Sequence, residues 1–214
     1  MGMEGFWEER YREEGKIWGD APSPTAIEAI NVFRDAGVSR VLVLGSGYGR
    51  NAEAFFRAGF DVTGIELSET AVKIARGSAP SITYHCGSVL DMPFDGSRYE
   101  GIYCFNVLHL FRKTEREIFI QLCRNQLSSG GILFFVVFSE KEESFGRGRE
   151  TEPGTFESKP GREVHYFTAG DLAGLFEGME ILNNNFAEEP EEHGAEGRHV
   201  HLLRFIVARK PSRI

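Results

Sequence analysis

A glycine-rich turn between two apolar segments constrains this chain more than any other feature of its sequence. Residues 41–44 read VLVL, the turn GSGYG follows at residues 45–49, and Glu66 ends the next apolar segment, VTGIE. A strand that runs into such a turn lets bare backbone approach a ligand closely. A carboxylate at the end of the following strand suits the hydroxyls of a ribose. The pattern therefore predicts an α/β fold that holds an adenosine-type cofactor.

The third glycine that a dinucleotide site needs is missing. The fingerprint GxGxxG places it at position 50, where this chain has Arg50, and no Gly-Lys-Ser/Thr follows to make a phosphate loop. The turn lacks a complete phosphate cradle, which favours an adenosine cofactor without phosphates over a nicotinamide cofactor. A plain tight turn is the competing interpretation of the glycines, and the position of Glu66 weighs against it.

Apolar segments that read as buried strands alternate with segments that read as helices. The expected strands are 40–44, 61–65, 81–85, 101–105, 132–138, 180–186 and 200–209. The expected helices are a short one near the start and 24–36, 51–58, 69–76, 114–127 and 168–177, with helix starts at Ser23-Pro24, Ser68, Thr114 with Glu117, and Thr168 with Asp171. This alternation predicts a single α/β domain over residues 1–214, with a parallel sheet covered by helices on both faces.

Three segments depart from the alternation. Residues 1–36 carry Phe6, Trp7, Tyr11 and Trp18, and we expect them to form a helical lid region. Residues 140–167 form an insertion on the substrate side, rich in glycine and charge over 140–165, where a long loop is expected. The acidic connection AEEPEEHGAEGRH, residues 187–199, is expected to be a solvated hairpin loop.

The composition bounds the partners of the chain. The net charge of −8 argues against broad contact with a phosphate backbone. The cysteines Cys86, Cys104 and Cys123 lie in apolar settings without a CxxC or Cys/His cluster, which predicts buried thiols and no metal. Because no apolar run has the length of a membrane helix and the start lacks a signal peptide, we expect a cytoplasmic protein without a membrane partner.

Five motifs together resemble one family. VLVLGSGYGRNA, GIELSETAV, GSVLDMPF, YEGIYCFNVLHLF and LSSGGILFF follow in an order and at a spacing similar to the class I S-adenosylmethionine-dependent methyltransferases, over residues 38–138. The opening FWEERYREEGKIWGDAPSP is similar to the small-molecule branch that includes thiopurine and tellurite-resistance methyltransferases. The resemblance implies a Rossmann-like seven-stranded mixed sheet of order 3-2-1-4-5-7-6 with the last strand antiparallel. It also implies methyl transfer from S-adenosyl-L-methionine to a small thiol, metalloid, hydroxyl or amine, with S-adenosyl-L-homocysteine as product.

The resemblance further implies which residues hold the cofactor. The expected contacts are Gly45, Ser46, Gly47, Asn51, Glu66, Leu67, Ser88, Val89, Phe105 and Asn106. The methionine part lies over the glycine turn, Glu66 takes the ribose and Leu67 the adenine. Ser88 stands where the family usually has an aspartate, so Ser88, the Val89 backbone or Asp91 is left to meet the adenine amino group.

The substrate side is expected to include Tyr11, Trp18, His109, Arg147 and Tyr166, with Arg149 at the border of the insertion. Aromatic faces suit a sulfonium cation. A thiol or metalloid anion needs no protein base, whereas a hydroxyl or amine acceptor would benefit from one, with His109 and His165 as candidates. A packed core histidine is an equal interpretation of His109, so no catalytic residue is assigned.

Two further expectations concern function. The segment CFNVLHL lacks the Asn/Asp-Pro-Pro-aromatic motif of nucleic-acid amino methyltransferases, which weighs against DNA or RNA as substrate. The alternative function is a non-catalytic module that binds S-adenosylmethionine and regulates a partner. We expect a monomer or homodimer.

Overall fold

The computed structural model describes residues 3–193 and 197–212. One mixed sheet contains β1 (Arg40–Leu44), β2 (Asp61–Glu66), β3 (Thr83–Cys86), β4 (Tyr99–Phe105), β5 (Leu127–Phe138), β9 (Glu180–His193) and β10 (Gly197–Arg209). Its order is β3-β2-β1-β4-β5-β10-β9, in which β1–β5 pair in parallel and β10 is antiparallel to both neighbours. When only the seven strands of this sheet are numbered along the chain, β9 becomes strand 6 and β10 becomes strand 7. The order is then 3-2-1-4-5-7-6, so the predicted fold class is confirmed.

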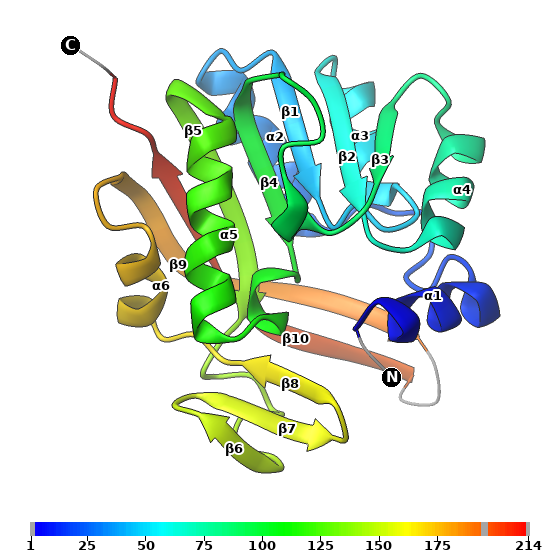
Figure 1. Cartoon of the computed structure of the whole chain (residues 1–214), viewed down its shortest axis with the longest axis vertical. Helices are drawn as coiled ribbons and strands as arrows, with labels where there is room; N and C mark the ends of the chain where they lie inside the picture. Colours follow the sequence, from blue (N-terminus) through cyan, green and yellow to red (C-terminus); the bar gives the residue numbers. More distant parts are fainter. Residues whose placement is uncertain (1–2, 194–196, 213–214) are drawn as a thin grey trace.

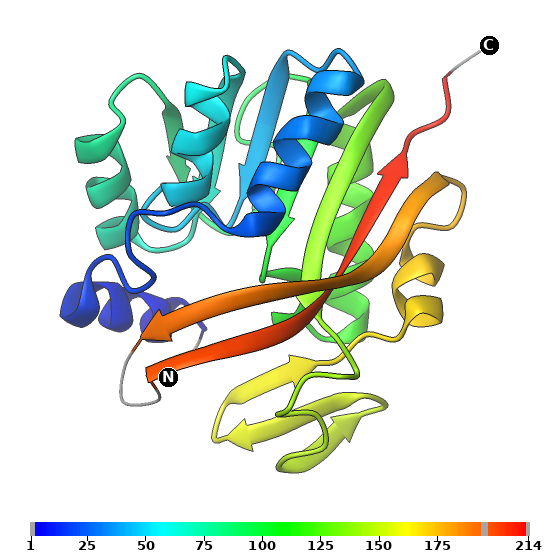
Figure 2. The same cartoon turned by 180° about the vertical axis from the view of Figure 1, so that it is seen from behind.

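Helices cover both faces of the sheet (Figures 1 and 2). On one face lie α2 (Pro24–Asp35), α3 (Arg50–Arg57) and α4 (Glu69–Ser78), and on the other α5 (Lys113–Gln126) and α6 (Ala169–Leu175). The first face buries Phe33 and Phe55, and the second buries Phe119 and Phe176. Short 3-10 helices, η1 (Val89–Asp91) and η2 (Leu108–Leu110), follow β3 and β4. Both faces are thus packed, and ligand space is left at the carboxyl ends of the strands.

The helix starts follow from side-chain caps. The hydroxyl oxygens of Ser23 and Ser68 each accept a backbone N–H three residues on, at 3.1 Å, as predicted. Thr168 begins α6 in a capping box with Asp171. The predicted start at Thr114 is wrong: α5 begins at Lys113, and the Glu115 carboxylate accepts the Arg112 backbone N–H at 2.9 Å. Since glutamates occur at both 115 and 117, the sequence allowed either register.

The acidic connection before residue 200 is not a solvated loop. Strands β9 and β10 extend through it as one long hairpin, with paired residues from Arg209 with Glu180 to Gly197 with His193. Residues 194–196, within the predicted loop, lie outside the described residues. The hairpin crosses the carboxyl-terminal edge of the parallel strands and reaches toward the N-terminal helix α1 (Met3–Glu14) (Figures 1 and 2). Glu189 and Glu191 on this hairpin are buried, so the expectation that an acidic segment is exposed to solvent was wrong here.

The insertion after β5 is also more ordered than predicted. It forms a three-stranded antiparallel sheet of β6 (Arg149–Glu152), β7 (Thr155–Lys159) and β8 (Arg162–His165) instead of a long loop. Gly154 and Gly161, both with a φ of +73°, lie in its two turns, and Gly148 directly precedes β6. A Cβ on Gly148 would lie 2.3 Å from the Glu157 carbonyl oxygen, so that close approach requires glycine. The small sheet lies beneath the carboxyl ends of the main strands (Figure 1).

One side chain of helix α1, Glu8, is hydrogen-bonded to the start of α4. The Glu8 carboxylate accepts hydrogen bonds from the Ser68 hydroxyl at 2.7 Å and from the Thr70 hydroxyl and backbone N–H at 2.6 and 3.1 Å. These bonds lower the pKa of Glu8 to about 2. A carboxylate at a helix N-terminus is favourable also because of the helix dipole. The predicted N-terminal helix is therefore present and anchored beside the carboxyl end of β2.

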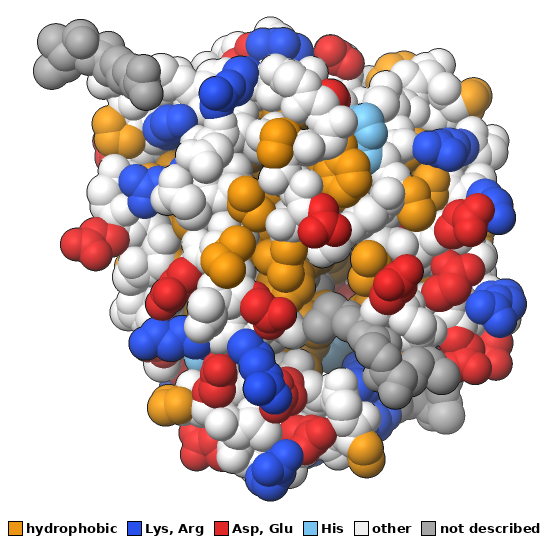
Figure 3. All heavy atoms as spheres, viewed as in Figure 1, with side chains coloured by type: hydrophobic (Ala, Val, Ile, Leu, Met, Phe, Trp, Pro, Cys, Tyr) orange, Lys and Arg blue, Asp and Glu red, His pale blue; other side chains and the backbone are white. Residues whose placement is uncertain are grey.

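Two remaining sequence expectations concern the surface. Cys104 and Cys123 are buried as predicted, whereas Cys86 at the end of β3 is exposed. Among the described residues, no helix has the length and apolar character needed to cross a bilayer. On the face shown in Figure 3, basic side chains are interspersed with acidic ones around a hydrophobic centre.

Replacing Glu189 with glutamine is expected to stabilise the protein at pH 8 but not at pH 5. Glu189 is 1% exposed, its carboxylate oxygens lack a hydrogen bond among the described residues, and Arg50 Nη2 lies 3.9 Å away. Burial raises its pKa to about 7. Protonated Glu189 therefore contributes its full stabilisation of the folded state below about pH 4.5. As the pH rises through 7, the free energy of unfolding falls by up to about 3 kcal/mol because the buried carboxylate ionises. Glutamine stays neutral and avoids this loss.

Thermal unfolding at the two pH values measures this effect. Glu188→Gln is the matched control, because Glu188 is the neighbouring, exposed residue of the same strand. An equal change in melting temperature at pH 5 and pH 8 for Glu189→Gln would contradict the assignment of a raised pKa to this side chain.

Candidate functional site

A cavity of about 1240 Å³ opens at the carboxyl ends of the parallel strands. Its walls come from α1, the glycine turn after β1, the ends of β2 and β4, the β6–β8 sheet and the β9–β10 hairpin. The volume exceeds the roughly 300–1,000 Å³ of a usual single-ligand pocket. The cavity therefore has room for a cofactor and a second small molecule together.

The glycine turn brings backbone to the cavity wall. Gly45, Gly47 and Gly49 have φ of +62°, +55° and +95°, a region that favours glycine. A Cβ on Gly45 would lie 2.2 Å from Val107 Cγ2, and one on Gly47 would lie 2.9 Å from the Tyr11 hydroxyl. The turn thus admits a ligand against its backbone only because it carries no side chains at these positions.

Glu66 lies beside this turn, as its spacing predicted. Its carboxylate accepts the backbone N–H of Gly47 at 2.8 Å and of Ser68 at 2.9 Å. Burial raises the pKa of Glu66, while the hydrogen bonds from Ser68 and Gly47 oppose that rise. Each carboxylate oxygen keeps a second lone pair, so the group can still accept hydroxyl donors from the cavity.

Polar atoms without protein partners lie in the same wall. Among the described residues, neither Ser46 Oγ nor Asn106 Oδ1 has a hydrogen-bond partner, although both atoms are buried. Asn106 has a φ of +56°, the one non-glycine residue with positive φ in the described part of the chain. A buried polar atom is costly unless a ligand or water satisfies it. Strain and unsatisfied atoms together point to ligand binding at the end of β4.

The remaining residues predicted to bind the cofactor lie on the cavity wall, except the alternative Asp91. Asn51, Leu67, Ser88, Val89 and Phe105 all line the cavity. The Asn51 side-chain oxygen accepts the Ser23 backbone N–H at 2.9 Å, so this oxygen ties the N-terminal segment to α3. The Ser88 hydroxyl accepts the Leu90 N–H at 3.1 Å. Asp91, the third alternative for the adenine amino group, is exposed and does not line the cavity.

Aromatic side chains close the cavity from the N-terminal side. Tyr11 is buried and lies within 6.2 Å of Tyr48, measured between ring centroids, and Trp18 stacks on Tyr48 at 6.4 Å. The Tyr48 hydroxyl donates to the Gly19 carbonyl at 2.7 Å, and the Trp18 N–H donates to that hydroxyl at 3.0 Å. The segment after α1 is therefore held against the glycine turn by specific contacts.

The two candidate histidines differ in position. His109 lines the cavity, stacks on Phe138 with ring centroids 4.4 Å apart, and its Nδ1 is buried with no hydrogen-bond partner among the described residues. Burial and the nearby His165, His201 and Arg162 lower its pKa to about 3. His165 does not line the cavity. Its Nδ1 lies 2.9 Å from the Thr155 hydroxyl, and burial lowers its pKa to about 4.

The insertion supplies further wall residues. Tyr166 is buried, lines the cavity, and donates from its hydroxyl to Ser144 Oγ at 2.9 Å. Arg147 also lines it but is exposed and paired with Glu143. Arg149 pairs with Glu157 at 2.8 Å and does not reach the cavity. Arg162, which was not predicted, lies over the Phe6 ring at 4.6 Å and lines the cavity.

The largest group that the sequence did not reveal comes from the hairpin. Glu191, His199 and His201 line the cavity together with Glu142. Glu191 and His199 fell in the segment predicted to be a solvated loop, and His201 lies beside it, whereas Glu142 fell in the long loop predicted for the insertion. The spacing of His199 and His201, two positions apart, was the one sequence signal that could have placed these histidines on a shared face of a strand.

Part of the chain matches a known family of protein domains. Residues 41–131 match the family described as "Methyltransferase domain". A ubiquinone biosynthesis O-methyltransferase from Bordetella avium is 31% identical over 111 residues, which are 50% of this chain and 45% of that protein. The chain spans about half the length of the curated relatives it matches.

Solved structures share the fold over most of the chain. A protein that converts a disulfide bond into a thioacetal group during echinomycin biosynthesis superimposes with a TM-score of 0.78 and 18% identity, over 99% of this chain and 93% of that one. TehB from Haemophilus influenzae superimposes with a TM-score of 0.67 and 16% identity, over 95% of this chain and 67% of that one. A third structure is that of the 1,6-didemethyltoxoflavin-N1-methyltransferase of Burkholderia thailandensis with S-adenosylhomocysteine bound. It superimposes with a TM-score of 0.71 and 19% identity, over 98% of this chain and 88% of that one. The fold is thus that of class I S-adenosylmethionine-dependent methyltransferases.

Proposed function

We propose that this chain, whose residues 41–131 form a methyltransferase domain, transfers a methyl group from S-adenosylmethionine to a small molecule. The observation that carries the proposal is the buried Glu66 carboxylate beside the bare glycine turn, at one end of a cavity large enough for two ligands. Two of the proteins named above are an O-methyltransferase and an N1-methyltransferase by name, and a third converts a disulfide bond into a thioacetal group. These names support a small acceptor and leave its reacting atom open.

The residues present fit S-adenosylmethionine. Ser46 and Asn106 offer buried polar atoms, and the glycine turn offers backbone that any Cβ would obstruct. In the proposed arrangement the methionine part lies over Gly45, Ser46 and Gly47, Glu66 accepts the ribose hydroxyls, and Leu67 contacts the adenine. Ser88 and the Val89 backbone are then the candidates for the adenine amino group, because Asp91 lies outside the cavity.

In the same arrangement, residues 1–36 act as a lid and the 140–167 insertion as the acceptor wall. Glu8 fixes the lid on α4, and Tyr11 and Trp18 add aromatic faces that attract a sulfonium cation. Phe105 and Asn106 end β4 on the cavity side. The protein then aligns acceptor and methyl group in a space shielded from water.

The sulfonium already activates the carbon, so the chain has to position the acceptor and, for some acceptors, remove a proton. A thiolate needs no base. A hydroxyl or amine benefits from an acceptor for its proton, and His109 is the neutral imidazole on the cavity wall. His165 is no longer a candidate for this step, since its ring faces Thr155.

Turnover of labelled S-adenosylmethionine with a panel of phenols, amines, thiols and metalloids tests the function. Replacing His109 with alanine is expected to lower kcat for phenols and amines by about tenfold, because its lowered pKa makes it a weak base, and to leave thiols nearly unchanged. Because the pKa of His109 is lowered to about 3, it stays neutral from pH 8 to pH 5, and its protonation should not reduce the rate in that range.

His165→Ala is the matched control, and it should leave the ratio of phenol to thiol turnover unchanged. Tight binding of S-adenosylmethionine without turnover of any acceptor would instead favour the alternative function, a non-catalytic regulatory module. Absence of binding would overturn both.

A further inference from the structure

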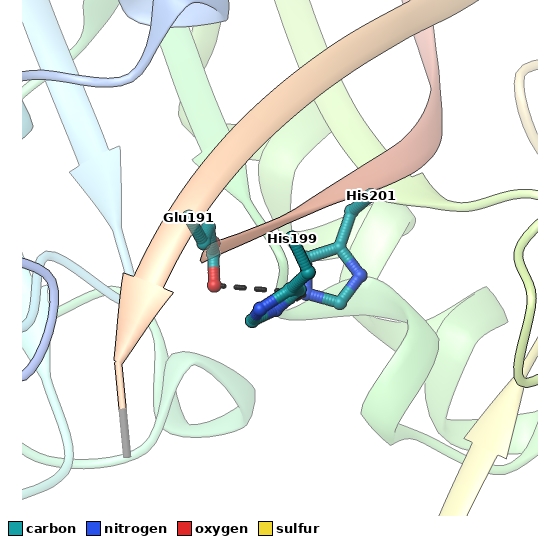
Figure 4. A group of neighbouring side chains, drawn as sticks. All are labelled: Glu191, His199 and His201. Carbon is teal, nitrogen blue, oxygen red and sulfur yellow. Dashed lines mark hydrogen bonds and ion pairs between the residues drawn. The ribbon is translucent and has the colours of Figure 1, made fainter. Parts of the chain in front are cut away.

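The β9–β10 hairpin brings three metal-ligand side chains to one point on the cavity wall. The strand register pairs Glu191 with His199, and His201 follows two positions later on the same face of β10. One ligand atom of each lies within 4.8 Å of the others. Figure 4 shows the three side chains converging from the two strands. The cluster is therefore a product of cross-strand pairing and not of a contiguous motif.

Hydrogen bonds determine which ring nitrogens carry protons. His201 Nδ1 lies 2.8 Å from a carboxylate oxygen of Glu142, and His199 Nδ1 lies 3.0 Å from the Gly197 carbonyl oxygen. Both partners are acceptors, so each Nδ1 carries the proton and donates it. The Nε2 atoms of the two rings face each other 3.0 Å apart, the distance at which they share a proton or a metal ion.

Two imidazole nitrogens this close need a cation between them, either a proton or a metal ion. Two imidazole nitrogens about 2.05 Å from one metal ion are 3.0 Å apart when the angle between them is about 95°. A carboxylate oxygen of Glu191 lies 3.7 Å from His201 Nε2 and adds negative charge at the same point. The geometry thus matches that of ligands around a single cation.

We propose that Glu191, His199 and His201 bind a divalent transition-metal ion such as Zn²⁺. Two imidazoles and one carboxylate form the ligand set of catalytic zinc sites, which leave a coordination position for water or substrate. Nitrogen ligands disfavour Mg²⁺. Glu142 is 7% exposed, also accepts the Leu202 N–H at 2.9 Å, and is the positioning residue that fixes the ring of His201.

The position of the ion extends the proposed function, on which this step rests. The Phe138 ring stacks on His201 with centroids 5.4 Å apart and on His109 at 4.4 Å, so the cluster and His109 flank one aromatic wall. An acceptor hydroxyl bound to the ion would be acidic enough to pass its proton to His109 across this wall. The oxygen then forms the new O–CH₃ bond, the S–CH₃ bond breaks, and its electron pair stays on sulfur. The site therefore selects hydroxyl acceptors that can coordinate a metal.

The test is a titration of the full, metal-stripped chain with CoCl₂, followed by visible absorption, and competition with ZnCl₂ and MgCl₂. We expect one Co²⁺ per chain, displaced by Zn²⁺ but not by Mg²⁺. His199→Ala and His201→Ala should each weaken Co²⁺ binding by more than about 100-fold, and Glu142→Gln by about tenfold. His85→Ala is the control, because His85 lies on β3 beside Asp95 and outside the cavity lining.

Calorimetry with S-adenosylmethionine on the same samples separates the two proposals and reports on folding. If S-adenosylmethionine binds normally but Co²⁺ does not bind, the metal site alone is overturned. The cation between the two imidazoles would then be a shared proton. Co²⁺ binding without S-adenosylmethionine binding overturns the proposed function alone. If both bind, phenol methylation should fall at least about tenfold on metal removal while thiol methylation persists; equal rates would overturn the role of the ion in acceptor binding.

Discussion

Replacing Glu66 with alanine is expected to weaken S-adenosylmethionine binding by at least about 100-fold. Charge-assisted hydrogen bonds from two ribose hydroxyls are lost, each worth about 1.5–3 kcal/mol. The alanine also leaves the backbone N–H groups of Gly47 and Ser68 without the carboxylate that accepts them at 2.8 and 2.9 Å. Calorimetric titration with the cofactor measures the loss directly.

Two variants show whether the loss comes from the carboxylate. Glu66→Gln keeps the shape of the side chain and one acceptor, so its affinity should fall between those of the alanine variant and the native chain. Glu69→Ala, three residues on, removes an exposed glutamate that pairs with Lys73, and should leave affinity unchanged. Unchanged affinity in Glu66→Ala would contradict the assignment of the ribose site.

Replacing Gly45 with alanine is expected to destabilise the fold by about 3 kcal/mol and to abolish measurable cofactor binding. One part of the cost is the φ of +62°, which disfavours any Cβ by about 1 kcal/mol. The larger part is the contact at 2.2 Å with Val107 Cγ2, since an extra methyl in a packed site costs about 1–3 kcal/mol. Val107 follows the strained Asn106, so the displacement also reaches the end of β4.

Gly37→Ala separates these two parts. Gly37 has a φ of +69° with open space around its Cβ position, so only the conformational cost of about 1 kcal/mol applies. The double variant Gly45→Ala/Val107→Ala removes the clashing methyl and should regain about 1–2 kcal/mol relative to Gly45→Ala. Denaturant unfolding provides the values. Equal losses for Gly37→Ala and Gly45→Ala would show that Val107 is not the obstacle.

The parallel half of the fold could be predicted because its residues follow strong local rules. Strands buried on both faces read as continuous apolar runs, such as 41–44 and 132–138, and serine caps marked the starts of α2 and α4. The carboxyl ends of such strands meet at one edge. The glycine turn and Glu66 therefore came together from spacing alone, in the relation that the structure shows.

The cavity wall formed by the insertion and the hairpin could not be predicted, because its residues come together through pairing between strands and not through local composition. Glu189 and Glu191 point inward on β9, so a hydrophobic pattern of period two was hidden by charge. The strands of the insertion are only four or five residues long and carry few aliphatic side chains. The expectation of no metal rested on the absence of Cys/His motifs. Glu191 meets His199 through strand register, which a search for sequence spacing does not detect.

The sheet order has a consequence for folding of the nascent chain. β5 lies between β4 and β10, and its segment ILFFVVF is almost wholly buried. Until β10 pairs with it, one edge of β5 presents unpaired backbone groups on a flat, apolar, β-branched and aromatic strand, the kind that templates aggregation. The whole insertion, α6 and β9 are synthesised before β10. This edge of β5 therefore stays open until β10 has been synthesised and pairs with it.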